Sequence, residues 1–458
     1  MKNFIFLILF YTFSTFANGS RPPQNPPQAP DNDRSVFKVN PDTLRLQLMD
    51  ENMDIIHAAH RVATAKSQLN LARSNLFPSI NLGTVLLSAG QPTFMLSSIE
   101  VLAPFLLPSK WFELRKAKFQ IKADQSAYHV IQLSVYANVW SLYQTLLNDQ
   151  KLLNQLLIDA EDWRLIEEKT AERFEWGLVT QQEMILAKSQ RALAFLRAEK
   201  VKGLLVEEKA QLKNALGLGI GRSLFIEESS IPTQTEENWS TEKLRDASLE
   251  KSPEIAQLYF LEQAGITDRW SRIFGFIVGA SASQSASGSG SVGTAFDGFT
   301  GRGVANFGLA QFPVISLASR NIESIQLRRK ELGREIGKLS EVLLGHFPIL
   351  HSRLALANEA ETALRENFDR ILENYQLGLG ATLNDVLRAR IGIQEATVER
   401  IRATTDLNLG RISLMRLLRK AEFSKVDGCH YPVISERQRG AKTPDGRLKI
   451  CTKIQPES

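Results

Sequence analysis

Long proline-free stretches are the feature that most restricts the fold of this chain of 458 residues. No proline occurs between Pro108 and Pro232, or between Pro348 and Pro432. Both stretches are rich in Leu, Ala, Glu, Lys, Gln and Arg, which have high helix propensity, whereas proline interrupts a helix by removing a hydrogen bond. The sequence therefore predicts a mainly α-helical fold with helices much longer than those of a compact domain.

Apolar residues in the first stretch recur with helical spacing. One stripe steps by alternating three and four residues, as in a coiled coil; it contains Val139, Leu142, Leu146, Leu153, Leu156, Ala160 and Trp163, with Asp149 as a polar member. A second stripe contains Leu133, Trp140, Tyr143 and Leu147. Two stripes require neighbours on two sides. The helix predicted over 109–171 is roughly 95 Å long at 1.5 Å per residue, so we expect an elongated wall or barrel of helices.

One short sequence occurs in both halves of the chain. The first copy, "ERFEWGLVTQQEMILAK", runs from Glu172 to Lys188, and the second, "ENYQLGLGATLNDVLRAR", runs from Glu373 to Arg390. Aligned on Gly177 and Gly378, the copies also match Phe174 with Tyr375. Self-similarity at a long offset indicates internal repeats, and we therefore expect two.

Each copy has the residues that end one helix and begin another. Gly177 and Gly378 are placed to end a helix in the left-handed conformation that favours glycine. A Thr-x-x-acid sequence follows, which is typical of a capping box at the start of the next helix; the pairs are Thr180 with Glu183 and Thr382 with Asp385. The sequence thus predicts two helical hairpins with short tips. Pro348 falls inside the second long helix and should kink it.

Four short segments between the helices have a different character: 79–88, 93–103, 274–285 and 303–312. In the third, apolar and small residues alternate from Phe274 onward. Segments of this length with one apolar face suit transmembrane β-strands, which need about 9–11 residues when tilted. A small soluble β-element is the alternative. Four strands in lipid would leave two unpaired edges, so a barrel would require several chains.

The two ends of the chain have compositions unlike the rest. Residues 1–17 read as a signal peptide, and 18–40 as a Pro-rich flexible lead-in. We place the first repeat at 41–230, the second at 231–425 and a C-terminal tail at 426–458. That tail holds both cysteines of the chain, Cys429 and Cys451, and we expect a disulfide between them in an exported protein.

Charge and motif content argue against an enzyme or a nucleic-acid-binding protein. The net charge is only +5, and basic residues are interleaved with acidic ones, as on solvated helix faces. Nothing resembles a nucleophile with its base, a phosphate-binding loop or a paired-carboxylate site, and we expect no cofactor. Asp54, His57 and His60 share a helix face, but a polar stripe is a simpler interpretation than a metal site.

These features resemble the TolC-like family of outer-membrane efflux and secretion channels. The resemblance covers about residues 40–420. It rests on the doubled tip sequences and on three passages between strand and helix; these are "ARSNLFPSI" at 72–80, "APFLLPSKWFELRKAKFQ" at 103–120 and "AQFPVISLASRNIESIQ" at 310–326. It implies an elongated α-helical barrel of long antiparallel helices, continued by a transmembrane β-barrel that trimerisation completes with four strands from each chain.

The resemblance also implies a function. The chain would be the outer-membrane exit duct of a tripartite efflux or type I secretion system, a passive conduit gated at its periplasmic tips. Its partners would be a homotrimer, a periplasmic adaptor, an inner-membrane pump and outer-membrane lipid, without nucleic acid. An elongated periplasmic scaffold or adaptor without a barrel is the alternative, and the four strand segments argue against it.

Specific residues of the tips carry roles by this resemblance. The adaptor would dock on Gly177, Leu178, Thr180, Gly378, Leu379 and Thr382. Asp385 matches the first of two acidic residues that form an inner constriction in the family. Arg388 stands at the position of the second, so an acidic ring is not expected here. Asp385 and Arg388 lie one helical turn apart and are expected to pair.

Overall fold

The computed structural model describes residues 36–77, 107–219, 221–282, 311–377, 379–420 and 422–426, and this part of the chain is mostly helical, as predicted. The first half contains α1 (Pro41–Glu51), α2 (Met53–Ser74), α6 (Pro108–Glu175) and α7 (Gln181–Ala215). The second half contains the 3-10 helix η2 (Thr235–Asn238), α8 (Thr241–Lys251), α9 (Pro253–Ala282), α11 (Gln311–Gln376), α12 (Leu383–Leu418) and α13 (Glu422–Val426). Strands β1 (Phe37–Val39) and β2 (Leu224–Ile226) pair in parallel.

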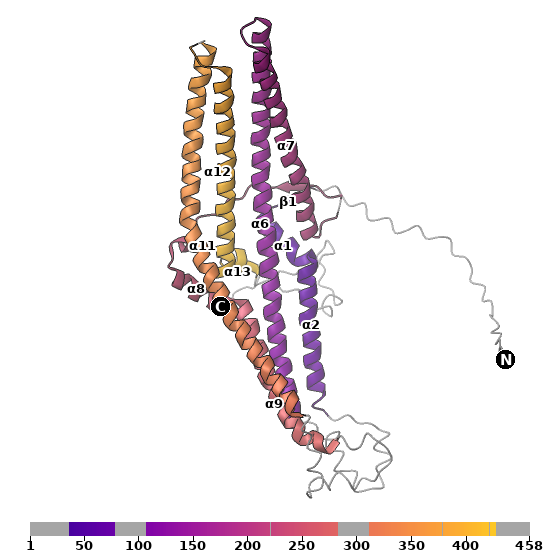
Figure 1. The fold of residues 1–458 in the computed structure, drawn as a ribbon. Helices are drawn as coiled ribbons and strands as arrows, with labels where there is room; N and C mark the ends of the chain where they lie inside the picture. Colours follow the sequence, from indigo (N-terminus) through magenta and orange to yellow (C-terminus); the bar gives the residue numbers. More distant parts are fainter. Residues whose placement is uncertain are drawn as a thin grey trace, which may run out of the picture.

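The molecule is elongated (Figure 1). At one end, the antiparallel hairpins α6–α7 and α11–α12 lie side by side and finish in two tips. Toward the other end, α2, α6, α9 and α11 run together. Helix α6 has 68 residues, which corresponds to about 100 Å, and it contributes to both ends of the molecule. A helix of this length needs partners along its whole course.

Both predicted apolar stripes of α6 are buried against such partners. All four members of the second stripe, Leu133, Trp140, Tyr143 and Leu147, have exposures of 6% or less. In the first stripe, Leu146, Ala160 and Trp163 are almost fully buried. Helix α6 packs against α2, α7, α9 and α12, so the prediction of neighbours on two sides is confirmed.

An aromatic cluster forms where α13 packs against α6, near the middle of the elongated molecule. Phe423 of α13 packs against Tyr136 and Trp140 of α6, with ring centroids 5.2 and 5.6 Å apart. The Tyr143 hydroxyl donates a hydrogen bond to the Glu227 carbonyl, 2.5 Å away, just after β2. Buried aromatic rings contribute large apolar areas, and a buried Tyr hydroxyl needs a polar partner. These contacts fix the position of α6 relative to the segment that joins the two halves.

The structure corrects the third predicted strand. Residues 274–282 continue helix α9, and the Phe274 ring stacks on Phe112 of α6 with centroids 5.3 Å apart. A helix satisfies its backbone hydrogen bonds within the segment, whereas a strand needs a paired neighbour. The alternation of apolar and small residues was therefore not decisive. The strands predicted at 79–88 and 93–103, and 303–310 of the fourth, lie outside the described residues; Gln311 and Phe312 begin α11.

The lead-in ends sooner than predicted, because Phe37–Val39 form β1 and Val39 is fully buried. Pro348 does lie inside α11. Figure 1 shows α11 changing direction near α8, and Leu244 of α8 packs on Phe347 there, in agreement with the predicted kink. The predicted signal peptide and the two cysteines lie outside the described residues.

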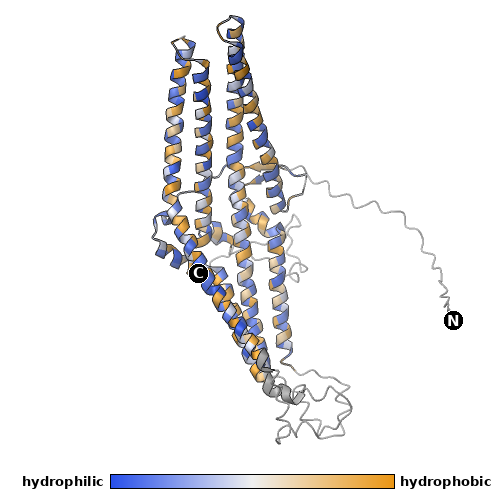
Figure 2. Ribbon diagram, viewed as in Figure 1, coloured by the Kyte–Doolittle hydropathy of each residue, from blue (hydrophilic) through white to orange (hydrophobic). Residues whose placement is uncertain are grey.

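Apolar and polar residues alternate along the long helices (Figure 2). Of the helices in the described ranges, none combines the length and the apolar character needed to cross a bilayer. On α2, Asp54, His57 and His60 belong to no group of three potential metal ligands within that part of the chain.

Candidate functional site at the helical tips

The turn between α6 and α7 has the predicted caps. Gly177 adopts φ of 69°, and its N–H donates to the Phe174 carbonyl at 2.9 Å. The Leu178 N–H donates to the Arg173 carbonyl at 2.9 Å, which completes the paired bonds of a Schellman motif. Thr180 and Glu183 then form a reciprocal capping box that starts α7. The sequence prediction is confirmed at this tip.

The turn between α11 and α12 is built in the same way. The Leu379 N–H donates to the Asn374 carbonyl at 2.9 Å, the equivalent of the Leu178 bond. Thr382 and Asp385 form the second capping box. Gly380 has φ of 85°, while Gly378 lies outside the described residues. Both capping boxes are therefore confirmed, and the glycine seen in the left-handed region is two residues later than predicted.

Apolar side chains project from both tips. Leu178 and Leu379 are each 67% exposed, Trp176 is 72% exposed and Leu377 is 64% exposed. Exposed apolar groups gathered at a loop tip are typical of an interaction surface. Gly177 has open space where a side chain would be added, so this turn is free of packing on the chain itself.

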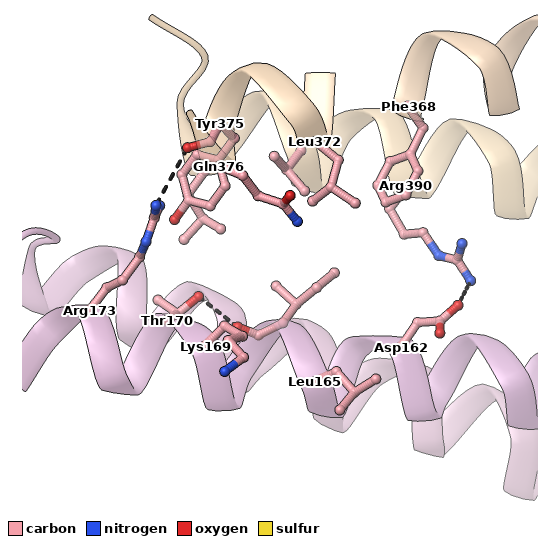
Figure 3. A pocket seen from close by; sticks show the side chains of 13 residues that line it. Asp162, Leu165, Lys169, Thr170, Arg173, Phe368, Leu372, Tyr375, Gln376 and Arg390 are labelled. Atoms are coloured by element: carbon pink, nitrogen blue, oxygen red, sulfur yellow. Dashed lines mark hydrogen bonds and ion pairs between the residues drawn. The ribbon is translucent and has the colours of Figure 1, made fainter. Parts of the chain in front are cut away.

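A groove of about 580 Å³ separates the two hairpins just behind the tips (Figure 3). Helix α6 forms one wall, and α11 and α12 form the other. Its lining is mostly apolar with charged residues at both ends; it comprises Asp162, Leu165, Ile166, Lys169, Thr170, Arg173, Phe368, Leu372, Tyr375, Gln376, Leu383, Val386 and Arg390. The groove therefore lies at the junction of the two hairpins.

Arg390 of α12 connects the hairpins at one end of this groove. One guanidinium nitrogen lies 2.6 Å from the Asp159 carboxylate and also forms an ion pair with Asp162, both on α6. The side chains of Arg390 and Asp159 are only 8% and 2% exposed. Burial raises the pKa of the Asp159 carboxyl, and Arg390 opposes that rise in pKa. We call Arg390, Asp159 and Asp162 the tip clamp.

Within the tip clamp, Arg390 and Asp159 are poorly solvated, whereas the Asp162 side chain is 40% exposed. The second carboxylate oxygen of Asp159 and Nε of Arg390 are buried without a hydrogen-bond partner among the described residues. Breaking a buried ion pair by removing one member typically costs about 3–5 kcal/mol, because the other charge is left uncompensated. The clamp therefore holds the hairpins together only while both signs of charge are in place.

Two further arginines link the hairpins. Arg173 of α6 lies over the Tyr375 ring, 4.2 Å from its centroid, and donates a 3.5 Å hydrogen bond to the Tyr375 carbonyl. Arg197 of α7 donates to the Gln394 amide oxygen on α12. A guanidinium suits such contacts because it is planar, always charged and stacks on aromatic rings. Polar links thus connect α6 with α11 and α12, and α7 with α12.

The predicted pair of Asp385 and Arg388 does not form. The Asp385 carboxylate instead accepts hydrogen bonds from the Thr382 N–H at 3.0 Å and hydroxyl at 2.7 Å. The hydroxyl bond is the main reason that the pKa of Asp385 is lowered. Arg388 is exposed and forms no ion pair with a described residue, although its charge also helps to lower the pKa of Asp385. The Asp385 carboxylate binds Thr382 rather than Arg388 because the turn fixes Thr382 beside it.

Sequence reasoning missed the tip clamp. Arg390 aligns with Lys188 in the repeated sequence, so a cation at this position was visible in both copies. Its partners Asp159 and Asp162 lie more than 200 residues earlier on a different helix. Nothing in the local spacing indicates that pairing, which depends on the register between α6 and α12.

Comparison with known proteins finds a family model that matches part of the chain, and solved structures that share its fold. Residues 44–218 match the model of the family described as "Outer membrane efflux protein". No curated protein matches the sequence. The family match agrees with the predicted outer-membrane location and efflux role at the level of the family.

Several solved outer-membrane channels share the fold. The channel OprN superposes with a TM-score of 0.65 at 13% identity, over 84% of this chain and 90% of that one. The CmeC outer membrane channel of Campylobacter jejuni gives 0.61 at 15%, over 84% and 88%. The outer membrane protein VceC of Vibrio cholerae gives 0.61 at 12%, over 83% and 95%. The predicted resemblance to outer-membrane channels is thus confirmed at the level of the fold.

Proposed function

We propose that this chain, TolC-like in its fold and matching the outer membrane efflux family over residues 44–218, is the exit duct of an efflux or secretion system. The observation that carries the proposal is the family match combined with a shared fold along 84% of the chain. A transport channel needs no catalytic group, which agrees with the motif content of the sequence. The duct would sit in the outer membrane and extend into the periplasm.

Three copies of the chain would assemble the conduit. Each would contribute two hairpins to a helical tunnel and four strands to a shared barrel. Exposed apolar side chains support this assembly, because they line the hairpin helices and need cover. Val206 on α7 is 66% exposed, and Ile349 and Leu356 on α11 are 62% and 60% exposed.

The tips would be both the docking site and the gate. A periplasmic adaptor coupled to an inner-membrane pump would contact the apolar tip side chains, among them Leu178 and Leu379, with Thr180 and Thr382 holding the turns. Gly378 remains a proposed member of that surface. Opening would require the hairpins to move apart, and the tip clamp and the Arg173–Tyr375 contact oppose that motion. Asp385 and Arg388 remain proposed residues of the periplasmic constriction.

Reconstitution in planar bilayers tests this function. We expect the full-length protein to require detergent for extraction from the outer-membrane fraction and to form ion-conducting channels. The alternative, a periplasmic scaffold without a barrel, would be soluble without detergent and would leave the bilayer insulating. That outcome would refute the proposal.

A further inference from the structure

The exposed face of α6 near its first residue is basic and aromatic. Trp111, Arg115, Lys118 and Lys122 are all exposed, with Trp111 at 53%. Their spacing of four, three and four residues places them on one side of the helix. The aromatic residue is closest to the helix start, and the three cations follow along the next turns.

Grooves lie on either side of this stripe. One, of about 760 Å³, runs between α2 and α6 and includes Arg73 as well as the stripe residues. The other, of about 410 Å³, runs between α6 and α9. Phe112, Arg115 and Phe119 line both grooves. Because the two grooves share these residues, they form one surface with the stripe, and this surface contains both aromatic rings and cations.

Positive charge on this surface is not neutralised by a carboxylate of the described residues; Lys122 has an aromatic contact instead, with its ammonium 5.5 Å from the Phe260 ring centroid. The lining of the larger groove includes four cations, Arg73, Arg115, Lys118 and Lys122, and no Asp or Glu. None of the four forms an ion pair with a described residue. By contrast, the neighbouring Lys116 pairs with Asp268 at 2.7 Å. The surface thus matches an anion that also has an apolar part.

Its position points to the kind of anion. Helix α2 ends at Ser74 and α6 begins at Pro108, and these two ends lie together, far from the tips (Figure 1). The chain between them contains the two segments that the sequence predicts to cross the membrane. Under the proposed function, this is the end of the helical tunnel that meets the periplasmic face of the outer membrane.

We propose that this surface binds the headgroup of an anionic phospholipid, with Arg73, Arg115, Lys118 and Lys122 around the phosphate and Trp111 beside the upper acyl chain. The inference rests on the proposed function for its membrane contact. Trp is enriched at membrane interfaces because its ring is amphipathic. Clustered Lys and Arg next to a membrane attract anionic lipids, and basic pockets between helices bind their headgroups. The order of residues along α6, aromatic first and cations after, fits that geometry.

Native mass spectrometry of the detergent-purified full-length protein tests the proposal. The probes are phosphatidylglycerol and cardiolipin, compared with zwitterionic phosphatidylethanolamine. We expect tighter binding of the anionic lipids. The triple variant Arg115→Gln, Lys118→Gln and Lys122→Gln should weaken their binding by about fivefold for each charge removed, while phosphatidylethanolamine binding stays unchanged.

A matched control distinguishes an effect of this site from an effect of the net charge of the protein. Lys200→Gln, Lys202→Gln and Lys209→Gln on α7 remove the same charge elsewhere and should leave lipid binding as in the parent. Trp111→Ala should weaken binding of all three lipids alike. Equal binding of anionic and zwitterionic lipids by the parent, as would result if a second copy of the chain covered this face, overturns the inference.

Conductance distinguishes failure of the inference from failure of the proposed function. If parent and triple variant both conduct and neither prefers anionic lipid, only the lipid site is refuted. If neither inserts into bilayers although both have the native mass and helical circular dichroism spectrum, the proposed function fails and this inference falls with it.

Discussion

At the scale of single residues, a buried carboxyl pair joins α6 and α7. Asp149 is the polar member of the predicted seam of α6, and it faces Glu208 of α7. Glu208 is only 7% exposed, and one of its carboxyl oxygens is buried without a hydrogen-bond partner among the described residues. Burial, and then the neighbouring Asp149, raise the pKa of Glu208 to about 8. The folded protein therefore holds a proton on this pair that the unfolded chain releases near pH 4.5, the ordinary pKa of a Glu carboxyl.

This raised pKa predicts stability that falls with rising pH. Between the unfolded pKa and about 8 the folded state binds the extra proton, so the free energy of unfolding is largest in acid and declines until the pair has ionised. Glu208→Gln should raise the apparent Tm at pH 8.5 and have little effect at pH 5. The exposed neighbour Glu207→Gln is the control. Equal shifts of Tm at both pH values would show that the Glu208 carboxyl is not protonated in the folded state.

The tip clamp makes a second prediction for single residues. Arg390→Gln leaves Asp159 buried without its cation, which should weaken closure of the tip by on the order of 3 kcal/mol and raise single-channel conductance. Arg370→Gln is a matched control, because Arg370 is exposed and pairs with Glu366 on its own helix. Identical conductance in the two variants and the parent would mean that the clamp has no part in gating.

At the scale of elements, the sequence predicts best where the physics is local. The caps of α7 and α12 follow from Thr180 and Thr382 because a capping box involves residues only three apart. The burial of α6 follows from its apolar spacing. The strand predicted from Phe274 is wrong because the decisive contact is not local. Alternation of apolar and small residues describes only a side-chain pattern, whereas the choice between strand and helix depends on packing partners elsewhere in the chain, such as Phe112 of α6.

The candidate site shows the same division. The positions of the tips could be predicted from two short sequences, whereas the tip clamp could not, because it depends on how α6 and α12 pack. The prediction that Asp385 pairs with Arg388 was wrong, although the two residues are close in sequence. Asp385 had a second local partner, Thr382, with better geometry.

Helix ends offer a prediction at this scale. Gly217 ends α7 with φ of 64°, and a Cβ there would lie 2.7 Å from Cβ of Glu51 and 2.9 Å from its carbonyl oxygen. Gly177 ends α6 with a similar φ but open surroundings. Gly177→Ala should cost about 1 kcal/mol of conformational strain, and Gly217→Ala roughly 2–4 kcal/mol, because overpacking is added. Thermal unfolding followed by circular dichroism measures both.

Those two variants also separate folding from function. Gly177→Ala should leave the protein folded, so any loss of transport in that variant reports on the tip surface. If Gly217→Ala proved as stable as Gly177→Ala, the contact with Glu51 would not constrain the end of α7.

At the scale of the whole molecule, the two ends of the elongated structure have different roles under the proposed function. The end where α6 begins would meet the membrane, and the basic surface of α6 lies there. The opposite end carries the apolar tips and the tip clamp. Helix α6 (Pro108–Glu175) spans both ends and so connects the tips directly with the end near the membrane. In the proposed trimer, neighbouring copies would cover the exposed apolar residues of α7 and α11.

In the proposed trimer, three copies of Arg388 would lie around the axis of the tunnel at its periplasmic mouth. Asp385 is engaged in capping, so Arg388 is the cation left exposed beside it. Arg388→Asp changes the charge of each chain by two and of the mouth by six. We expect a shift toward cation selectivity in planar bilayers, strong in 0.1 M salt, where the Debye length is about 10 Å, and weak in 1 M salt, where it is about 3 Å. Arg402→Asp, on nearly the same face of α12 and about 21 Å farther from the tip, is the control. If both variants shift selectivity equally, or neither does at any salt concentration, Arg388 does not line the constriction and the narrowest part of the conduit lies elsewhere.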